Sequence, residues 1–233
     1  MRKHVKKFVS FLLIASLLIT MLPSVNVFAL QDGLARTPPM GFNTYNANMW
    51  QCGEVLFKQI CDGMVANGMQ DAGYLYVNSD AAWCDHDRYT PEGGHTFGDP
   101  RSAGATFPGG LDGVKTLSEY IRSKGMKWGV YHSLRHITLA GGNINKIAEE
   151  LDYIGIDFIK IDWLDSQFPP LPFVNAIRSY GNKVVISLSA DGNPQKGDQY
   201  GHMWRTSGDI DNNWSSVLSC FNSAMNNTAA SAL

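Results

Sequence analysis

Short apolar runs and longer amphipathic stretches alternate along the chain from about residue 38 onward. The longer stretches have a helical spacing of hydrophobic residues and close on glycine, which suits the left-handed position that ends a helix. The runs that follow are β-branched or aromatic and end in a polar residue, as in YLYVNSD, MKWGVYHS, DFIKID and KVVISLS. Because buried parallel strands read as short continuous apolar runs, this pattern predicts a βα-repeat protein with a parallel sheet.

Six strands and five helices are expected from this pattern. The strands fall near Met40–Tyr45, Tyr74–Asp80, Lys127–Ser133, Phe158–Trp163, Val184–Ser189 and Thr206–Ile210. The helices fall near Glu54–Asn67, Leu111–Ser123, Asn143–Ile154, Leu171–Tyr180 and Trp214–Met225. Residues 83–108, rich in Gly, Asp, His and Pro, form a long loop after the second strand, which is where barrels keep their chemistry.

Six βα units fit two architectures. A (β/α)8 TIM barrel needs eight units and would be incomplete, whereas an open doubly wound sheet would be complete with six strands. No GxGxxG follows the first strand, and polar residues end nearly every strand instead of only those at one switch point. We therefore predict the α/β class and a (β/α)8 barrel of which about six units are present.

The first 29 residues differ from the rest. A basic head, MRKHVKK, precedes an apolar core from Phe8 to Leu22, and Val27 and Ala29 occupy the positions that a signal peptidase reads. The apolar core is too short for a comfortable membrane span. We expect residues 1–29 to be a cleaved signal peptide of a secreted protein and residues 30–233 to be the barrel domain; an uncleaved N-terminal anchor is the alternative.

Composition narrows the partners and the redox chemistry. The chain is 44% hydrophobic and 17% charged with a formal net charge of −2, and no basic run follows the signal, so neither nucleic acid nor a membrane is expected as partner. An exported protein meets an oxidising compartment, and we favour one disulfide, Cys52 with Cys84. Cys61 and Cys220 fall in helical patterns and are expected to be buried thiols. No CxxC or Cys/His cluster indicates zinc, and we expect no metal or other cofactor.

Two charged residues interrupt the apolar run FIKIDWL. In a strand, Phe158, Lys160 and Asp162 share one face, while Ile159 and Ile161 share the other and can pack under helices. An ammonium two residues from a carboxylate on the same face lowers the pKa of that carboxylate and keeps it ionised, as a covalent nucleophile requires. The alternative is a buried Lys–Asp pair that serves only the fold.

A second acidic cluster lies in WRTSGDIDNNW. Asp before an amphipathic run is a strong helix N-cap signal, and Asp211 suits that role because it lies nearer the helix start. Asp209 is left as a candidate acid/base, with Arg205 nearby to hold substrate or to tune the carboxylate. Two carboxylates on different strands of one barrel indicate glycoside hydrolysis.

A third polar strand end adds residues suited to sugar binding. Asp80 ends the second strand, where its carboxylate can accept hydrogen bonds from sugar hydroxyls, and Trp83 follows it. An aromatic ring suits the apolar face of a sugar, although Trp83 could equally anchor the loop.

At these residues the sequence resembles the α-galactosidase (melibiase) family, glycoside hydrolase family 27. LARTPPMGFNTYN is similar to the first strand of that family, YLYVNSDAAW to the second, and FPGGLDGVKTLSEYIRSKGMKWGVY to the second helix and third strand. DFIKIDWL resembles the nucleophile strand and WRTSGDIDNNW the acid/base segment. The similarity runs in the family's order from Leu34 to about Trp214 and implies a (β/α)8 barrel.

Position by position, the resemblance implies that Asp162 is the nucleophile, with Lys160 beside it, and that Asp209 is the acid/base. It also implies four substrate-contacting residues: Tyr45, Asp80, Tyr131 and Arg205. Tyr45 stands where the family usually has tryptophan. The implied mechanism is retaining, for which the two carboxyl groups lie about 5 to 5.5 Å apart.

Three departures from the family concern the sugar. Ala81 replaces the second of two adjacent aspartates that grip galactose, and Ser189 and Ala190 replace a cysteine and a glutamate on the fifth strand. We expect a secreted retaining glycosidase that cleaves terminal α-D-galactosyl residues. The alternatives are a divergent member that acts on an α-glucoside or isomalto-type substrate or a β-L-arabinopyranoside, and an inactive sugar-binding fragment.

Other departures concern cysteines and length. Leu164 replaces a disulfide cysteine after the nucleophile, and Ala82 replaces the usual cysteine of the second strand, with Cys84 close enough for a shifted bridge to Cys52. The resemblance also implies that this chain is truncated before the last two βα units and the family's C-terminal β-sandwich. The oligomeric state stays open.

Overall fold

The computed structural model describes residues 30, 32–97, 107–164, 167–181, 183–190 and 200–226. The predicted signal peptide, residues 1–29, lies outside the described residues. Within the described part, six strands form one sheet in chain order: β1 (Gly41–Asn43), β2 (Tyr76–Asn78), β3 (Lys127–Ser133), β4 (Phe158–Leu164), β5 (Val185–Ala190) and β6 (Met203–Trp204). Every pair of neighbouring strands is parallel.

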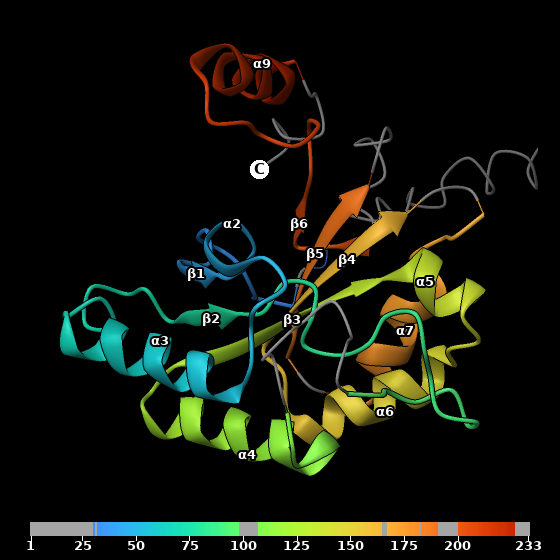
Figure 1. The fold of residues 1–233 in the computed structure, drawn as a ribbon. Coiled ribbons are helices and arrows are strands. Elements are labelled where there is room, and N and C mark those ends of the chain that lie inside the picture. Colours follow the sequence, from blue (N-terminus) through green and yellow to red (C-terminus); the bar gives the residue numbers. More distant parts are fainter. Residues whose placement is uncertain are drawn as a thin grey trace, which may run out of the picture.

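Helices connect the strands, and four of them cover one face of the sheet. The helices are α2 (Tyr45–Asn48), α3 (Glu54–Ala66), α4 (Gly110–Ser123), α5 (Leu134–Leu139), α6 (Ile144–Ile154), α7 (Leu171–Ser179) and α9 (Trp214–Met225). Figure 1 shows the sheet curling, with α3, α4, α6 and α7 gathered on its outer side. A doubly wound sheet would reverse its strand order and carry helices on both faces. The observed order and one-sided cover are those of a partial (β/α) barrel.

Helix α6 shows how the local sequence sets the elements. The side chain of Asn143 caps its start by accepting hydrogen bonds from the backbone N–H groups of Asn145 and Lys146. Gly155 ends it with a φ of 70°, a left-handed conformation that glycine adopts without strain. The glycine-terminated helix predicted from the sequence is therefore confirmed here.

The two faces of β4 bury different groups. Ile159 and Ile161 are fully buried in the core between sheet and helices. Phe158 points to the other face, where it packs with Tyr76 and Val185 at the amino-terminal ends of the strands. Lys160 and Asp162 continue that inner face toward the carboxyl end. The predicted alternation along this strand is confirmed.

Some predicted elements differ from the structure. The sixth strand lies at Met203–Trp204, so the expected strand at Thr206–Ile210 was wrong, and β1 ends at Asn43 so that Tyr45 begins α2. The short helix α5, directly after β3, was not predicted. The expected cap is also wrong: Asn213, and not Asp211, caps α9 by accepting a hydrogen bond from the backbone N–H of Ser216 at 2.9 Å.

Helix α9 is exposed on all sides. None of its residues is buried, and its apolar side chains, including Trp214, Phe221 and Met225, are largely open to solvent. Figure 1 shows this helix standing away from the other helices. Over the described residues, no helix has the length and apolar character needed to cross a bilayer.

Candidate active site

A pocket of about 380 Å³ opens at the carboxyl ends of the strands. Its lining combines carboxylates, cations and aromatic rings contributed by β3, β4, α5 and the segments that follow β1, β2 and β6. The lining residues are Tyr45, Trp50, Asp80, Ala81, His86, Tyr131, Ser133, His136, Lys160, Asp162, Trp163, Arg205 and Asp209. The sequence analysis predicted seven of these as site residues.

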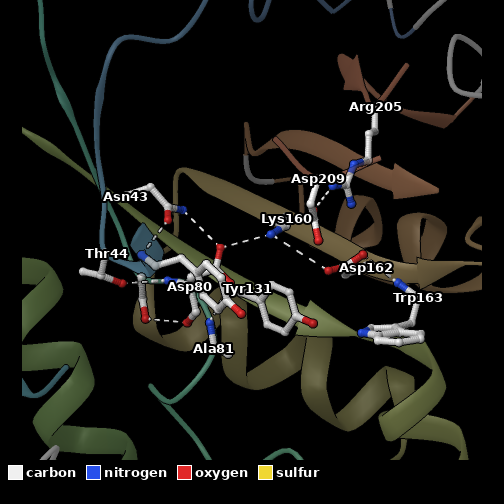
Figure 2. A network of polar contacts seen from close by, with 12 residues as sticks. Asn43, Thr44, Asp80, Ala81, Tyr131, Lys160, Asp162, Trp163, Arg205 and Asp209 are labelled. Atoms are coloured by element: carbon white, nitrogen blue, oxygen red, sulfur yellow. Dashed lines mark hydrogen bonds and ion pairs between the residues drawn. The ribbon is translucent and has the colours of Figure 1, made fainter. Parts of the chain in front are cut away.

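Lys160 lies between two carboxylates from different strands (Figure 2). Its Nζ is 3.1 Å from Asp80 Oδ2 and 3.9 Å from Asp162 Oδ2. The same ammonium lies 5.1 Å from the ring centroid of Tyr131, a cation–π distance. The register explains this grouping, because Tyr131 on β3 and Ser187 on β5 pair with Lys160 on either side.

Asp80 is held rigidly at the end of β2. Its Oδ2 accepts a hydrogen bond from Asn43 Nδ2 at 3.3 Å as well as the ion pair from Lys160, and its Oδ1 accepts one from the backbone N–H of Ala81 at 3.0 Å. Its own N–H donates to Thr44 Oγ1 at 3.1 Å. Figure 2 shows two of these partners side by side: Asn43, the last residue of β1, and Thr44, which follows it. The carboxylate is buried, and its orientation is fixed from three directions.

Asp162 is partly buried at the end of β4, with 16% of its side chain exposed. Its Oδ1 accepts a hydrogen bond from the backbone N–H of Trp163 at 2.9 Å. Burial raises the pKa of Asp162 above its ordinary value, and this outweighs the lowering by Lys160, by the Trp163 N–H and by Arg205. Lys160 lowers this pKa as expected, but the net shift is upward because burial has the larger effect and the lysine is closer to Asp80.

A β-bulge follows Asp162. The register between β4 and β5 shifts between Asp162 and Leu164, and Trp163 has a φ of 53°. A bulky side chain rarely adopts this left-handed conformation, which costs on the order of 1–3 kcal/mol. The bulge brings the side chain of Trp163, a residue that is 45% exposed, to the pocket edge, and it directs the backbone N–H of Trp163 onto Asp162.

Tyr131 stands beside both carboxylates. Burial raises the pKa of its phenol strongly, and repulsion of the ionised form by Asp162 and Asp80 adds to the rise. The hydroxyl therefore stays protonated at physiological pH. It can donate a hydrogen bond into the pocket.

Arg205 and Asp209 form an ion pair on the segment after β6. The Arg205 side chain is mostly buried at 21% exposure, whereas the carboxylate of Asp209 is 92% exposed. Figure 2 shows Arg205 and Asp209 on the side of the site where Asp162 lies. The site thus holds one half-buried and one solvated carboxylate.

The structure brings together all but one of the predicted site residues. Tyr45, Asp80, Tyr131, Lys160, Asp162, Arg205 and Asp209 all line the pocket. Trp83 does not, and its predicted contact with sugar is wrong. Its ring is fully buried, its Nε1 donates to the Tyr131 carbonyl at 2.8 Å, and it packs on His95 and His132, so it anchors the loop.

Besides Ala81, which the sequence analysis treated only as a departure from the family, five pocket residues were not predicted as site residues. They are Trp50, His86, Ser133, His136 and Trp163. Ser133 could have been found, because it ends the third strand as Asp80 and Asp162 end theirs. Trp50, His86 and His136 follow strands in loops or helices, where their direction depends on long-range packing, and Trp163 reaches the pocket through the bulge in β4.

The predicted Cys52–Cys84 disulfide does not form in the structure. The thiol of Cys52 donates to the carbonyls of Ala81 and Met49, at 3.4 and 3.6 Å. The Sγ of Cys84 instead lies 3.8 Å from His86 Nδ1. Cys61 is a buried thiol, as predicted, while Cys220 is only partly buried. In the described part of the chain, the cysteines are all thiols.

The sequence is similar to known α-galactosidases over most of its length. The model of the family described as Alpha galactosidase A matches residues 43–171. An alpha-galactosidase of Cyamopsis tetragonoloba is 30% identical over 212 residues, which cover 84% of this chain and 49% of that protein. Alpha-galactosidase A of Cellvibrio japonicus is 32% identical over 211 residues, 85% of this chain and 49% of that protein.

The solved structures agree. Alpha-galactosidase I of Mortierella vinacea superposes with a TM-score of 0.66 and 28% identity, covering 78% of this chain and 48% of that one. The prediction of an incomplete (β/α)8 barrel is confirmed by this likeness and by the six-stranded sheet. The chain spans about half the length of the relatives it matches.

Proposed function

The chain belongs to the alpha galactosidase A family of glycoside hydrolases, and we propose that its pocket cleaves terminal α-D-galactosyl residues with retention of configuration. One observation carries the proposal: Asp162, half-buried on a barrel strand, shares a pocket with a second, solvated carboxylate, Asp209. Two carboxyl groups in different environments are what acid/base and nucleophilic roles require.

Asp162 is the proposed nucleophile. Its Oδ1 accepts the Trp163 N–H, which leaves Oδ2, the oxygen nearer Lys160, to attack the anomeric carbon. A bond forms between that oxygen and the anomeric carbon while the glycosidic C–O bond breaks. The partial desolvation that raises the pKa of Asp162 also makes the ionised carboxylate more reactive, since fewer waters must be displaced.

Asp209 is the proposed acid/base. It gives a proton to the departing glycosidic oxygen and then takes one from the water that hydrolyses the glycosyl-enzyme ester, which frees Asp162. The ion pair with Arg205 keeps its side chain at the mouth of the pocket, where the leaving group exits. A retaining reaction predicts about 5 to 5.5 Å between the two carboxyl groups in the complex with substrate.

The remaining polar groups bind the sugar in this proposal. Asp80 accepts hydrogen bonds from ring hydroxyls and Lys160 donates to them, because each keeps atoms open to the pocket. The protonated phenol of Tyr131 donates to the carboxylate of Asp162 or to the ring oxygen. Tyr45 and Arg205 complete the wall on either side.

The proposal extends to export and to the domain boundary. The basic head, the apolar core and the Val27 and Ala29 positions support a signal peptide over residues 1–29 and a secreted barrel domain from residue 30.

A second substrate is favoured by one observation. Ala81 lines the pocket at the position where the resembled family has a galactose-gripping aspartate, so one hydroxyl contact is absent there. An α-glucoside, an isomalto-type oligosaccharide or a β-L-arabinopyranoside would place a different group beside the Ala81 methyl, or no group at all.

The test is a panel of nitrophenyl glycosides offered to the purified chain and to Asp162→Asn. Release from the α-galactoside alone, abolished in the variant, supports the proposal. Turnover of only the α-glucoside or the arabinopyranoside would reject galactose and keep the mechanism. Binding of galactosides by the wild type without any turnover would identify an inactive sugar-binding protein.

A further inference from the structure

A cluster of one thiol and two imidazoles lies beside the pocket, and the proposed glycosidase chemistry does not use it. Cys84 and His86 come from the loop after β2, and His132 comes from the helix-facing side of β3. One donor atom of each lies within 4.8 Å of the others, and all three residues are buried, Cys84 and His132 completely.

His132 has a polar atom that nothing satisfies. Its Nδ1 is buried and has no hydrogen-bond partner, although the residue is fully enclosed. An unsatisfied buried polar atom costs about 1–3 kcal/mol, so its presence requires an explanation such as an ion. The residue that carries this atom is the one that groups with Cys84 and His86.

A chain of hydrogen bonds sets which nitrogen of His132 carries its proton. Glu150 Oε2 lies 2.6 Å from His95 Nδ1, and His95 Nε2 lies 2.8 Å from His132 Nε2. The carboxylate holds the His95 proton on Nδ1, so in the neutral ring His95 Nε2 accepts a hydrogen bond from His132 Nε2–H. His132 Nδ1 is then left with an unshared lone pair that can bind an ion.

This arrangement is the support that metal-binding histidines have. Such residues donate the ring N–H that faces away from the metal to a carboxylate, carbonyl or further acceptor, which fixes the tautomer. The hydrogen bonds from Glu150 through His95 to His132 give the ring this kind of support.

The spacing at Cys84 fits the same reading. Its Sγ is 3.8 Å from His86 Nδ1 and 3.9 Å from His86 Nε2. Zinc–sulfur and zinc–nitrogen bonds of about 2.3 and 2.0–2.1 Å place tetrahedral ligands about 3.5 Å apart. Both observed separations exceed that value by only a few tenths of an ångström.

We propose that Cys84, His86 and His132 bind a zinc ion, with a water or other small donor as fourth ligand. One thiolate and two imidazoles suit zinc, whereas magnesium and calcium select oxygen ligands. The ion ties the loop after β2, which carries Asp80 at its start, to β3, which carries Tyr131. Binding displaces one proton, from the Cys84 thiol.

The test measures metal directly and needs no substrate. The purified full chain is loaded with zinc, freed of excess by gel filtration and analysed for metal, together with Cys84→Ser and His132→Asn. Cys61→Ser is the matched control, because Cys61 is a buried thiol of α3 that contacts Met126 instead of the cluster. We expect one zinc per chain in wild type and control, and loss from the two cluster variants.

Cobalt(II) gives a readout that does not depend on any variant folding. The wild-type chain loaded with cobalt should show the charge-transfer band of a cobalt–thiolate bond and the visible bands of a tetrahedral ion. A spectrum without the thiolate band, wild-type protein that retains no stoichiometric zinc, or equal zinc in Cys84→Ser would each overturn the site.

Discussion

The ammonium of Lys160 pairs more closely with Asp80, at 3.1 Å, than with Asp162, at 3.9 Å, although Asp162 is its neighbour along the strand. Lys160 therefore links two strand ends and leaves Asp162 only partly compensated. Burial outweighs the lysine's effect, and the pKa of Asp162 rises. This relationship yields predictions for stability, for pH dependence and for catalysis.

Lys160→Met should destabilise the fold through Asp80. The Asp80 carboxylate is almost completely buried and would lose its charged partner, keeping only Asn43 and Ala81 as donors. We expect a loss of about 1–3 kcal/mol in the free energy of unfolding, measured by urea denaturation, because Lys160 itself is partly solvated.

Lys58→Met is the matched control for that variant. Lys58 pairs with Glu54 one turn away on α3, where both side chains are partly exposed. Its loss should cost less than about 1 kcal/mol. Equal losses in the two variants would contradict the structural role assigned to the Lys160–Asp80 pair.

The fall of kcat/KM on the acid side of its pH profile should occur at a higher pH than an aspartate with an ordinary pKa would give. Asp162 must be ionised to attack, and burial raises its pKa. Because Lys160 lowers this pKa, Lys160→Met should move the fall of kcat/KM further toward neutral pH. A fall that moves toward acid pH in that variant would contradict the assignment.

The same shift has a consequence for stability. An aspartate whose pKa is raised on folding is destabilising when ionised, so its cost is present above the folded pKa and vanishes at lower pH. Asp162→Asn should therefore abolish turnover while leaving the free energy of unfolding at neutral pH unchanged or higher. A marked loss of stability at neutral pH would show that the ionised carboxylate supports the fold.

Asp209→Ala should separate proton donation from nucleophilic attack. Its carboxylate is 92% exposed, so we expect the free energy of unfolding to change by no more than about 0.5 kcal/mol. Turnover of a substrate with a poor leaving group should fall by about 10²–10⁴-fold. A dinitrophenyl glycoside, whose leaving group needs no proton, should still be cleaved in the first step, and azide should rescue the second.

Trp83→Phe should affect stability and not sugar affinity. The indole of Trp83 is fully buried and donates to the Tyr131 carbonyl, so its replacement should cost about 1–3 kcal/mol in the free energy of unfolding. KM for an aryl glycoside, measured where the variant is folded, should stay close to wild type. Trp163→Ala, at the pocket edge, should show the opposite pattern, with raised KM and little loss of stability.

The sequence could predict what depends on local periodicity. Strand β3 and helix α9 begin and end where the pattern placed them, and Ile159 and Lys160 face opposite sides because adjacent strand residues must. The strand signal was weak at β6. The pattern predicted a strand at Thr206–Ile210, whereas β6 is Met203–Trp204.

Long-range packing could not be predicted. The direction of Trp83 depends on how the loop after β2 folds over β3, and the grouping of Cys84 with His132 joins residues far apart in the chain. The sequence therefore carries no metal motif of short Cys/His spacing that would predict the whole group. The sign of the pKa shift at Asp162 also needed the structure, because it depends on burial as well as on charge spacing.

The most direct test of the account is to trap the covalent intermediate. An activated 2-deoxy-2-fluoro-α-galactoside, incubated with the chain and digested for mass spectrometry, should add one fluorosugar to the peptide that contains Asp162. Asp162→Asn should stay unlabelled, and Asp209→Ala should still be labelled. Labelling of a different residue, or release of the β-anomer as the first product from an α-galactoside, would contradict retaining catalysis by Asp162.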